Sequence, residues 1–480
     1  IKDGYFCDFF NNINYHPILK IKLDLAKVEG LTDIKEDSFN DCLNIIEIKL
    51  SQGVSSINNN AFSGCENLSS VEIPASLTHI GDSAFERCVS LCSIVIPDGV
   101  NFVGKSAFAN CSELTSIKLP DSVLTIGSSA FKECKKLTNV TLPKWIEILP
   151  SSIFSNCSVL KSISIPNAVE NIGDNAFLGC IALESIVIPE NVITLGSSAF
   201  SGCEALTTVK LNDKIVSIED STFFNAKKLC SITGVSKIRS IKQSAFAGCA
   251  SLVTIENLQM LESIGQQAFK DCIVFETITL PTCFESIGSE AFFNCKALKQ
   301  LLLPENVSSI GESAFISCVS LEKINIPSKV KTLSAHVFHQ CTSLISITID
   351  EGVETILDRA FFECKKLQSI VLPSSLKVID TSVFLNCTSL KAITIPEKVY
   401  AIGNGIIVGC SSISSVEFKN TTDWYSTENP KYKNPDYKGG ETFDTSNTSK
   451  NVSSLKNEKL FLYNRVLKDL EYQTNNDYSL

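Results

Sequence analysis

Methionine, tryptophan and histidine are scarce in this chain, whose 480 residues include one Met, two Trp and four His. No run of about eighteen apolar residues occurs, so we expect no segment to cross a bilayer as a helix. Lysine and arginine form no cluster and the net charge is −10, which argues against a nucleic-acid-binding face. The chain begins at Ile1, and we expect a processed or trimmed piece, with any signal peptide or membrane anchor outside it.

A repeated unit fills most of the sequence. Its pattern, Ala-Phe-x-x-Cys followed by a short apolar stretch, recurs every 23 residues from Phe39 to Phe384, and Ile407 replaces the Phe in the last of seventeen copies. No copy carries an insertion or a deletion. A fixed period of about 20–30 residues with one apolar strand pattern is typical of a leucine-rich solenoid. We therefore predict an α/β repeat solenoid of about seventeen 23-residue coils.

Each copy divides into a strand, a connecting segment and a turn. In the second copy Val71 and Ile73 alternate with polar residues, the pattern of a strand with one buried face, and Pro74 ends the strand. Gly81 recurs in most copies, and we expect a left-handed conformation there. A short helical turn should hold the Phe and Cys of the motif. The prediction is a right-handed coil with a parallel β-sheet on the concave face and short helical or 3-10 turns on the convex face.

The twenty cysteines do not indicate a disulfide framework. Sixteen occupy one repeat position, and Ala226 fills the single gap, which indicates a site for a small apolar group. Neighbouring coils would hold these side chains parallel, with their Cβ atoms farther apart than the roughly 3.8 Å typical of a disulfide. We predict buried free thiols in this column, and no pairing among Cys7, Cys92, Cys230 and Cys283. Such thiols neither require nor exclude an oxidising compartment.

The pattern sets the expected domain boundaries. Residues 1–38 should be an N-terminal cap and residues 39–425 the solenoid, with Trp424 folding back over the last coil. Within the array, copies nine and ten lack several consensus residues, so we expect a bend, a strand irregularity or local opening near Phe223–Leu261. Residues 426–455 read as a polar linker. The apolar residues 456–480 fit either a helix or a hairpin around Asn464.

The sequence gives little support to catalysis or metal binding. No nucleophile-elbow, metalloprotease, P-loop or dinucleotide motif occurs. His336, His339 and Cys341 lie close together, but the two histidines occupy variable positions expected to be exposed, whereas Cys341 belongs to the buried column. We interpret the histidines as solvated turn residues and predict no catalytic, cofactor-binding or metal-binding residue.

Any function should therefore lie on the surface. Two residues of each strand are expected to project from the concave face, and the first is Ser or Thr in twelve of seventeen copies. One interpretation is a soluble, hydroxyl-lined face without a ligand. The other is a broad, shallow platform for an extended protein or glycan. Its candidate binding residues are Lys49, Glu72, Lys118, Trp145, Lys210, Glu256 and Lys323.

Nine Asn-x-Ser/Thr sequons occur, and some would be glycosylated if a eukaryotic cell secretes the chain. Many sequons arise by chance in a sequence rich in Ser and Asn. The asparagines are Asn67, Asn110, Asn139, Asn156, Asn306, Asn386, Asn420, Asn447 and Asn451.

The repeat closely resembles the BspA-like leucine-rich repeat family, as in Ala176–Gly196, AFLGCIALESIVIPENVITLG. Residues 417–426, EFKNTTDWYS, are similar to that family's array terminator. Residues 460–470, LFLYNRVLKDL, are similar to a segment that opens a further array, with Arg465 where the family tends to have Gly. This similarity favours the hairpin for residues 456–480. It also implies that the natural protein continues past Leu480.

The resemblance, which covers roughly residues 31–425, implies surface display, adhesion and binding of host or matrix proteins in bacteria and parasitic protists, with no residue motif to carry over. The sequence therefore favours a non-enzymatic adhesion or protein-binding protein of a cell surface, without a cofactor and with a protein or glycan ligand. The alternative is an intracellular leucine-rich-repeat scaffold for protein–protein interaction. Its best support is the column of reduced thiols.

Overall fold

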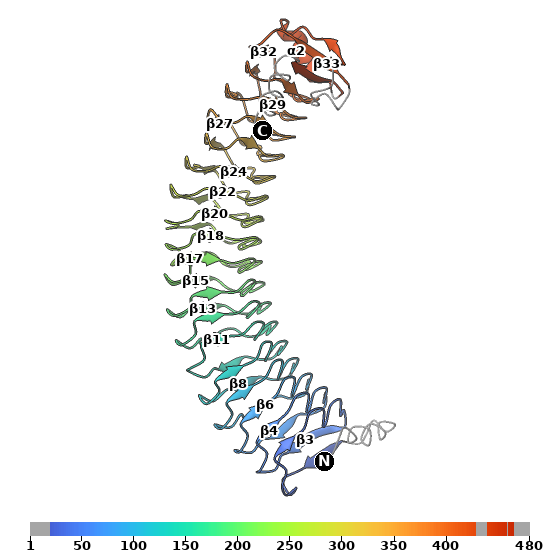
Figure 1. The fold of residues 1–480 in the computed structure, drawn as a ribbon, viewed down its shortest axis with the longest axis vertical. Coiled ribbons are helices and arrows are strands. Elements are labelled where there is room, and N and C mark those ends of the chain that lie inside the picture. Colours follow the sequence, from blue (N-terminus) through green and yellow to red (C-terminus); the bar gives the residue numbers. More distant parts are fainter. Residues whose placement is uncertain (1–19, 429–438, 458, 465–480) are drawn as a thin grey trace, which may run out of the picture. The chain divides into compact units, whose positions relative to one another are not determined.

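The structure is a computed structural model that describes residues 20–428, 439–457 and 459–464. The chain divides into two compact units, Ile1–Lys237 and Ile238–Leu480, which are described separately. Within each unit the coils stack one on the next (Figure 1). Neighbouring coils are joined by two rows of short parallel strands and by hydrogen-bonded turns. We call these the first strand row, the second strand row and the turn row.

The first strand row contains the predicted alternating strands. Ser70–Glu72 (β5) pairs in parallel with Ile45–Lys49 (β3), with Glu47 opposite Ser70, and only the central Val71 of β5 is buried. In unit 1 the row also includes β1 (Ile21–Asp24), β8 (Ser116–Lys118), β10 (Asn139–Thr141), β13 (Ser185–Val187), β15 (Thr208–Lys210) and β17 (Ser231–Thr233). In unit 2 it includes β19 (Thr254–Ile255), β21 (Thr277–Ile278), β23 (Gln300–Leu301), β25 (Lys323–Ile326), β27 (Ser346–Ile349), β30 (Ala392–Ile395) and β32 (Ser415–Phe418).

The second strand row was not predicted, because a strand of two residues is too short to show the alternation of buried and exposed side chains that identifies a strand in a sequence. His79–Ile80 (β6) pairs in parallel with Phe102–Val103 (β7), with the second residue of each strand buried. Unit 1 adds β2 (Asp33–Ile34), β4 (Ser56–Ile57), β9 (Thr125–Ile126), β11 (Ile148–Leu149), β12 (Asn171–Ile172), β14 (Thr194–Leu195) and β16 (Ser217–Ile218). Unit 2 adds β18 (Ser240–Ile241), β20 (Ser263–Ile264), β22 (Ser286–Ile287), β24 (Ser309–Ile310), β26 (Thr332–Leu333), β28 (Thr355–Ile356), β29 (Val378–Ile379) and β31 (Ala401–Ile402).

The prediction of short helical turns is wrong for the described coils, because the turn row contains hydrogen-bonded turns without helix. The backbone N–H of Phe85 donates to Ala107 O of the next coil at 2.8 Å, whereas a helix would direct it to a carbonyl of the same coil. Ser83 and Arg87 on either side have left-handed φ values of 52° and 60°, which a right-handed helix cannot contain. The parallel-strand solenoid is thus observed, but without a helical face.

The recurring glycine has a different role from the one predicted. Gly81, Gly104 and Gly127 are absent from the residues with positive φ, so no left-handed conformation requires them. A Cβ atom on Gly104 would lie 2.5 Å from Asp82 N and from Gly81 C of the preceding coil. Glycine is needed here because two backbones approach too closely for any side chain.

The core consists of columns of identical side chains, as predicted. Phe85 and Phe108 are fully buried and stack with ring centroids 5.4 Å apart and planes 4° apart. Neighbouring rings in the column repeat this arrangement at 5.2 to 5.7 Å within each unit. No coil could bury its ring alone, so the stacking of coils creates the core.

Copies nine and ten show the predicted strand irregularity. Gly234 and Asn257 occupy the second inward strand position and adopt left-handed φ values of 73° and 63°. The boundary between the two units also lies in this stretch, at Lys237.

Both ends of the array carry additional elements. In the predicted N-terminal cap, β1 and β2 pair in parallel with β3 and β4, so residues 21–34 already form a coil. At the other end, Trp424–Thr427 (β33) pairs antiparallel with Glu441–Thr442 (β34) and with Phe461–Asn464 (β35), and β35 pairs with β31. Trp424 is buried and its ring contacts Phe418 edge-on, as expected for a cap.

The C-terminal segments contain one element that was not predicted. Thr448–Leu455 (α2) is a helix inside the segment read as a polar linker, and Asn447 caps it by accepting a hydrogen bond from Lys450 N. Its buried Asn451 donates to Val416 O at 3.1 Å, so the polar side chain ties the helix to β32. Asn464 is the last residue of β35 and pairs with Trp424. The second half of the predicted hairpin lies outside the described residues.

Candidate binding surface

The first strand row of unit 2 is hollowed between Thr254 and Thr348. Two cavities of 530 and 620 Å³ lie on it, and both are lined by Thr277 and Thr279. The larger cavity reaches Thr254, Glu256 and Asn257, and the smaller reaches Gln300, Leu302, Lys323, Asn325, Ser346 and Thr348. They form one continuous surface, which we call the unit 2 hollow.

Hydroxyl and amide side chains share the hollow with aliphatic ones, and a charge lies near each end. Glu256 and Lys323 are exposed, and neither makes an ion pair within the described part of the chain. They are three coils apart, which is about 14 Å at the usual strand spacing. Leu302 lies between them, is 78% exposed and breaks the polar pattern of the outward positions. A ligand in the hollow could therefore contact the negative charge of Glu256, the apolar side chain of Leu302 and the positive charge of Lys323.

Leu302 was not among the predicted binding residues, although the sequence places it on the outward face of its strand. Residues 301–303 are three consecutive leucines, and strand alternation places the middle one outward. The side chain of Asn325 is not free to bind a ligand, because its amide donates to Leu303 O and accepts from Leu303 N, both at 2.8 Å.

The other predicted binding residues do not line the unit 2 hollow. Lys49 and Glu72 form an ion pair of 2.8 Å between adjacent coils, and the Glu72 hydrogen bond raises the pKa of Lys49. Lys118 and Lys210 are exposed at the ends of β8 and β15, four coils apart. Trp145 is 69% exposed but lies between β10 and β11, beyond the strand face on which it was grouped.

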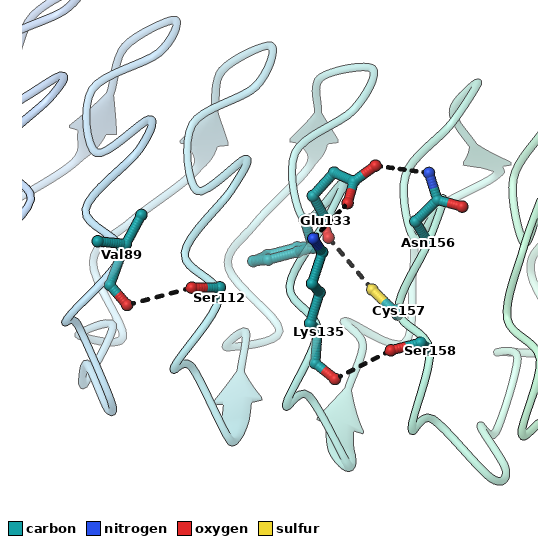
Figure 2. Close-up of polar contacts among 8 residues, drawn as sticks. Val89, Ser112, Glu133, Lys135, Asn156, Cys157 and Ser158 are labelled. Atoms are coloured by element: carbon teal, nitrogen blue, oxygen red, sulfur yellow. Dashed lines mark hydrogen bonds and ion pairs between the residues drawn. The ribbon is translucent and has the colours of Figure 1, made fainter.

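The cysteine column has a structural role. In Figure 2 the Cys157 thiol points to the preceding coil, where its Sγ donates to Phe131 O at 3.2 Å. Cys180 makes the same bond to Phe154 O, and burial raises its pKa to about 12. No cysteine of the described residues forms a disulfide, as predicted, and the cysteines of the column are buried. Protonated, inaccessible thiols are poor nucleophiles.

The sequon at Asn156 follows from the requirements of the turn row. Asn156 adopts a left-handed φ of 60° and donates to Glu133 Oε1 at 2.6 Å, while Ser158 donates to Lys135 O at 3.4 Å (Figure 2). Each residue of this Asn-Cys-Ser triplet thus contacts the preceding coil. The sequon at Asn451 is buried, so no glycan fits there without unfolding.

The histidine pair lacks the geometry of a metal site. His336 and His339 have ring centroids 5.5 Å apart, and His339 stacks on Phe362 at 4.4 Å. Cys341 instead donates its thiol to Phe315 O. Burial and the neighbouring His336 lower the pKa of His339. Among the described residues, no group of three potential ligands is arranged for a metal ion.

The stacked parallel strands and the column core define a β-solenoid of the leucine-rich-repeat type. The chain belongs to the BspA-type leucine-rich repeat family, as the sequence resemblance predicted. The family model described as "BspA type Leucine rich repeat region (6 copies)" matches residues 32–161, 147–273, 232–345, 262–391 and 314–428. No curated protein matches the chain. The helix of the described residues is too short and too polar to cross a membrane.

Several solved structures are similar. A leucine-rich repeat protein from Bacteroides ovatus is 27% identical, with 80% of this chain and 82% of that chain covered and a TM-score of 0.36. A leucine-rich cell surface protein from Faecalibacterium prausnitzii is 26% identical, with 66% and 83% covered and a TM-score of 0.41. A Treponema pallidum leucine-rich repeat protein is 26% identical over 38% of this chain and 78% of its own, with a TM-score of 0.30.

Proposed function

We propose that this chain is a non-enzymatic binding protein of a cell surface, and that the unit 2 hollow contacts its ligand. The observation that carries the proposal is the pair of cavities on one strand face, bounded by charges that have no ion-pair partner in the described chain. Membership of the BspA-type leucine-rich repeat family, for which surface display is expected, supports the location. Adhesion to host or matrix molecules is the role that fits both.

A protein ligand fits the hollow better than a neutral glycan. Glu256 and Lys323 can each form an ion pair with a peptide that has a basic and an acidic side chain, whereas a neutral sugar offers neither charge. The Thr and Ser hydroxyls can donate to and accept from a peptide backbone. No aromatic ring lines the cavities, so a sugar ring would find no flat apolar face.

Leu302→Arg should weaken ligand binding at least tenfold, because a long cation would fill the centre of the hollow. Val187→Arg is the matched control, since Val187 is also 78% exposed on the first strand row but belongs to unit 1. Binding of both variants to a panel of purified matrix and cell-surface proteins would be measured by surface plasmon resonance. Equal affinities of Leu302→Arg and the original chain for every protein bound would contradict the proposal.

The intracellular scaffold is the second candidate, and the free thiols favour it. Cys92, Cys230 and Cys283 are exposed and unpaired, a state that a reducing compartment maintains. Protease treatment of intact cells, followed by antibody detection of the solenoid, separates the two functions. Loss of the signal indicates surface display, and protection until the cells are lysed indicates the scaffold.

A further inference from the structure

A second surface, in unit 1, exposes three large apolar side chains in two adjacent coils. Leu124 is 70% exposed, Trp145 is 69% exposed and Ile148 is 56% exposed. The coils are in contact at this position, because Lys144 N donates to Asp121 Oδ1 at 3.1 Å. The 23-residue register places Leu124 opposite Glu147, between Trp145 and Ile148. We call Leu124, Trp145 and Ile148 the apolar patch.

The backbone beneath the apolar patch is also unusual. Hydrogen-bonded pairing is continuous from β2 to β9 and from β11 to β14, but the described structure contains no backbone hydrogen bond between β9 and β11. In the coil of Leu124, Gly127 donates its N–H to Val103 O of the preceding coil at 2.7 Å. Pro150 occupies the equivalent position one coil later, and proline has no N–H to donate. The Leu124 carbonyl also lacks a bond from the next coil, whereas the equivalent carbonyl of Asn101 accepts one from Leu124 N at 2.9 Å. An acceptor is thus available beside the exposed rings and aliphatic chains.

Charges around the apolar patch are mostly acidic. We counted charges in the part of each coil that runs from the proline after the first-row strand to the end of the second-row strand. In five successive coils these segments are residues 97–103, 120–126, 143–149, 166–172 and 189–195. Together they contain five acidic side chains and one lysine. The lysine, Lys144, is paired with Asp121 at 2.8 Å. The four remaining acidic side chains are exposed and make no ion pair within the described residues. They are Asp98, Glu147, Glu170 and Glu190.

We propose that the apolar patch docks a basic segment of a partner protein, which places one large apolar side chain on Trp145 and its lysines or arginines on the surrounding carboxylates. Tryptophan in such a setting is a frequent anchor of protein interfaces. A second copy of this chain is the wrong partner, because it would bring the same acidic charge and a net charge of −10. Phosphate-bearing nucleic acids and anionic membranes are repelled for the same reason.

The probe is the heptapeptide Lys-Ser-Lys-Leu-Lys-Ser-Lys, compared with the version that has Ser for Leu and the version that has Glu for every Lys. Trp145 reports the binding directly, since the only other tryptophan, Trp424, is 1% exposed. The basic peptide with Leu should shift the tryptophan emission to the blue in a saturable manner. The Ser version should bind at least tenfold more weakly, and the acidic version should give no shift. Equal binding of the two basic peptides, or no saturation, overturns the proposal.

Variants give a second readout through the anisotropy of the labelled peptide. Trp145→Ser and Leu124→Ser should each weaken binding at least fivefold, and Glu147→Gln with Glu170→Gln should reduce its dependence on salt. Val95→Ser is the matched control, because Val95 is 81% exposed in the same unit but lies in the first-row position of its coil. It should stay within twofold. All these side chains are exposed, so circular dichroism should show unchanged folding; equal losses for Val95→Ser and Trp145→Ser would overturn the assignment. Binding at the unit 2 hollow is unaffected by either result.

Discussion

Phe177→Ala should lower the free energy of unfolding by about 3–5 kcal/mol, the cost of removing a large ring from a close-packed core. Phe177 is fully buried between Phe154 and Phe200, with ring centroids 5.6 and 5.3 Å away. Its coil is held on both sides by ladder hydrogen bonds, such as Phe177 N to Ala199 O at 2.8 Å, so the backbone cannot close over the cavity. Denaturant titration followed by circular dichroism measures the loss.

Cys180→Ala is the matched control, three residues away in the same coil. It removes one sulfur and the hydrogen bond to Phe154 O, for which a loss of about 1 kcal/mol is expected. Ala226 already occupies the equivalent position in another coil. Repeat proteins can unfold in parts, so the slope and the midpoint of the transition are both compared. Equal losses for the two variants would contradict the assignment of the phenylalanine column as the main core element.

The sequence was sufficient to predict the repeat, the first strand row and the core columns. Each requirement is local and recurs: an inward Val71 or Ile94, a Phe that stacks on the next Phe, and a small thiol beneath it. Because every coil must satisfy its neighbours in the same way, a position that tolerates few residue types is visible many times in one chain. In a non-repeating domain each such position occurs once, so its requirement could not be recognised from a single sequence.

The turn row was misjudged because its geometry depends on contacts between coils. Ser83 and Arg87 are ordinary residues with positive φ, and nothing in their identity distinguishes this from a helical turn. The N–H of Phe85 has an acceptor 2.8 Å away in the next coil, so the backbone is satisfied without helix. A sequence pattern shows the periodicity within one segment, but it does not show that a carbonyl of the next coil accepts this hydrogen bond.

The candidate surfaces were only partly predictable for a similar reason. Glu256 and Lys323 were predicted because they should project from the concave strand face, and both line the unit 2 hollow. Lys49 and Glu72 were predicted for the same reason, yet they form an ion pair with each other between adjacent coils. Whether a face is hollowed depends on the stacking of several coils, which no single repeat encodes.

Gly127→Ala should lower the free energy of unfolding by about 3 kcal/mol, because the added methyl group overpacks the contact between two coils. The added Cβ would lie 2.2 Å from Lys105 N and 2.4 Å from Gly104 C, and both are backbone atoms that cannot rotate away. Relief requires the coils to separate, which would stretch the bond from Gly127 N to Val103 O, 2.7 Å long. Thermal and denaturant unfolding of the variant would measure the loss.

Gly99→Ala is the control for Gly127→Ala, because its Cβ would meet only the carbonyl oxygen of Leu77 at 3.1 Å and that of Ala75 at 3.3 Å. It should change stability by less than about 1 kcal/mol, since the unfolded chain also loses freedom when glycine becomes alanine. Asn58, at the position equivalent to Gly127, keeps its ladder bond to Ile34 O at 2.9 Å, so a side chain is accepted at this position in another coil. At Gly104 and Gly127 the backbone of the preceding coil lies too close for a Cβ atom, and this contact explains the glycine there. A loss no larger than that of Gly99→Ala would show that the coils separate freely and that the glycine has another cause.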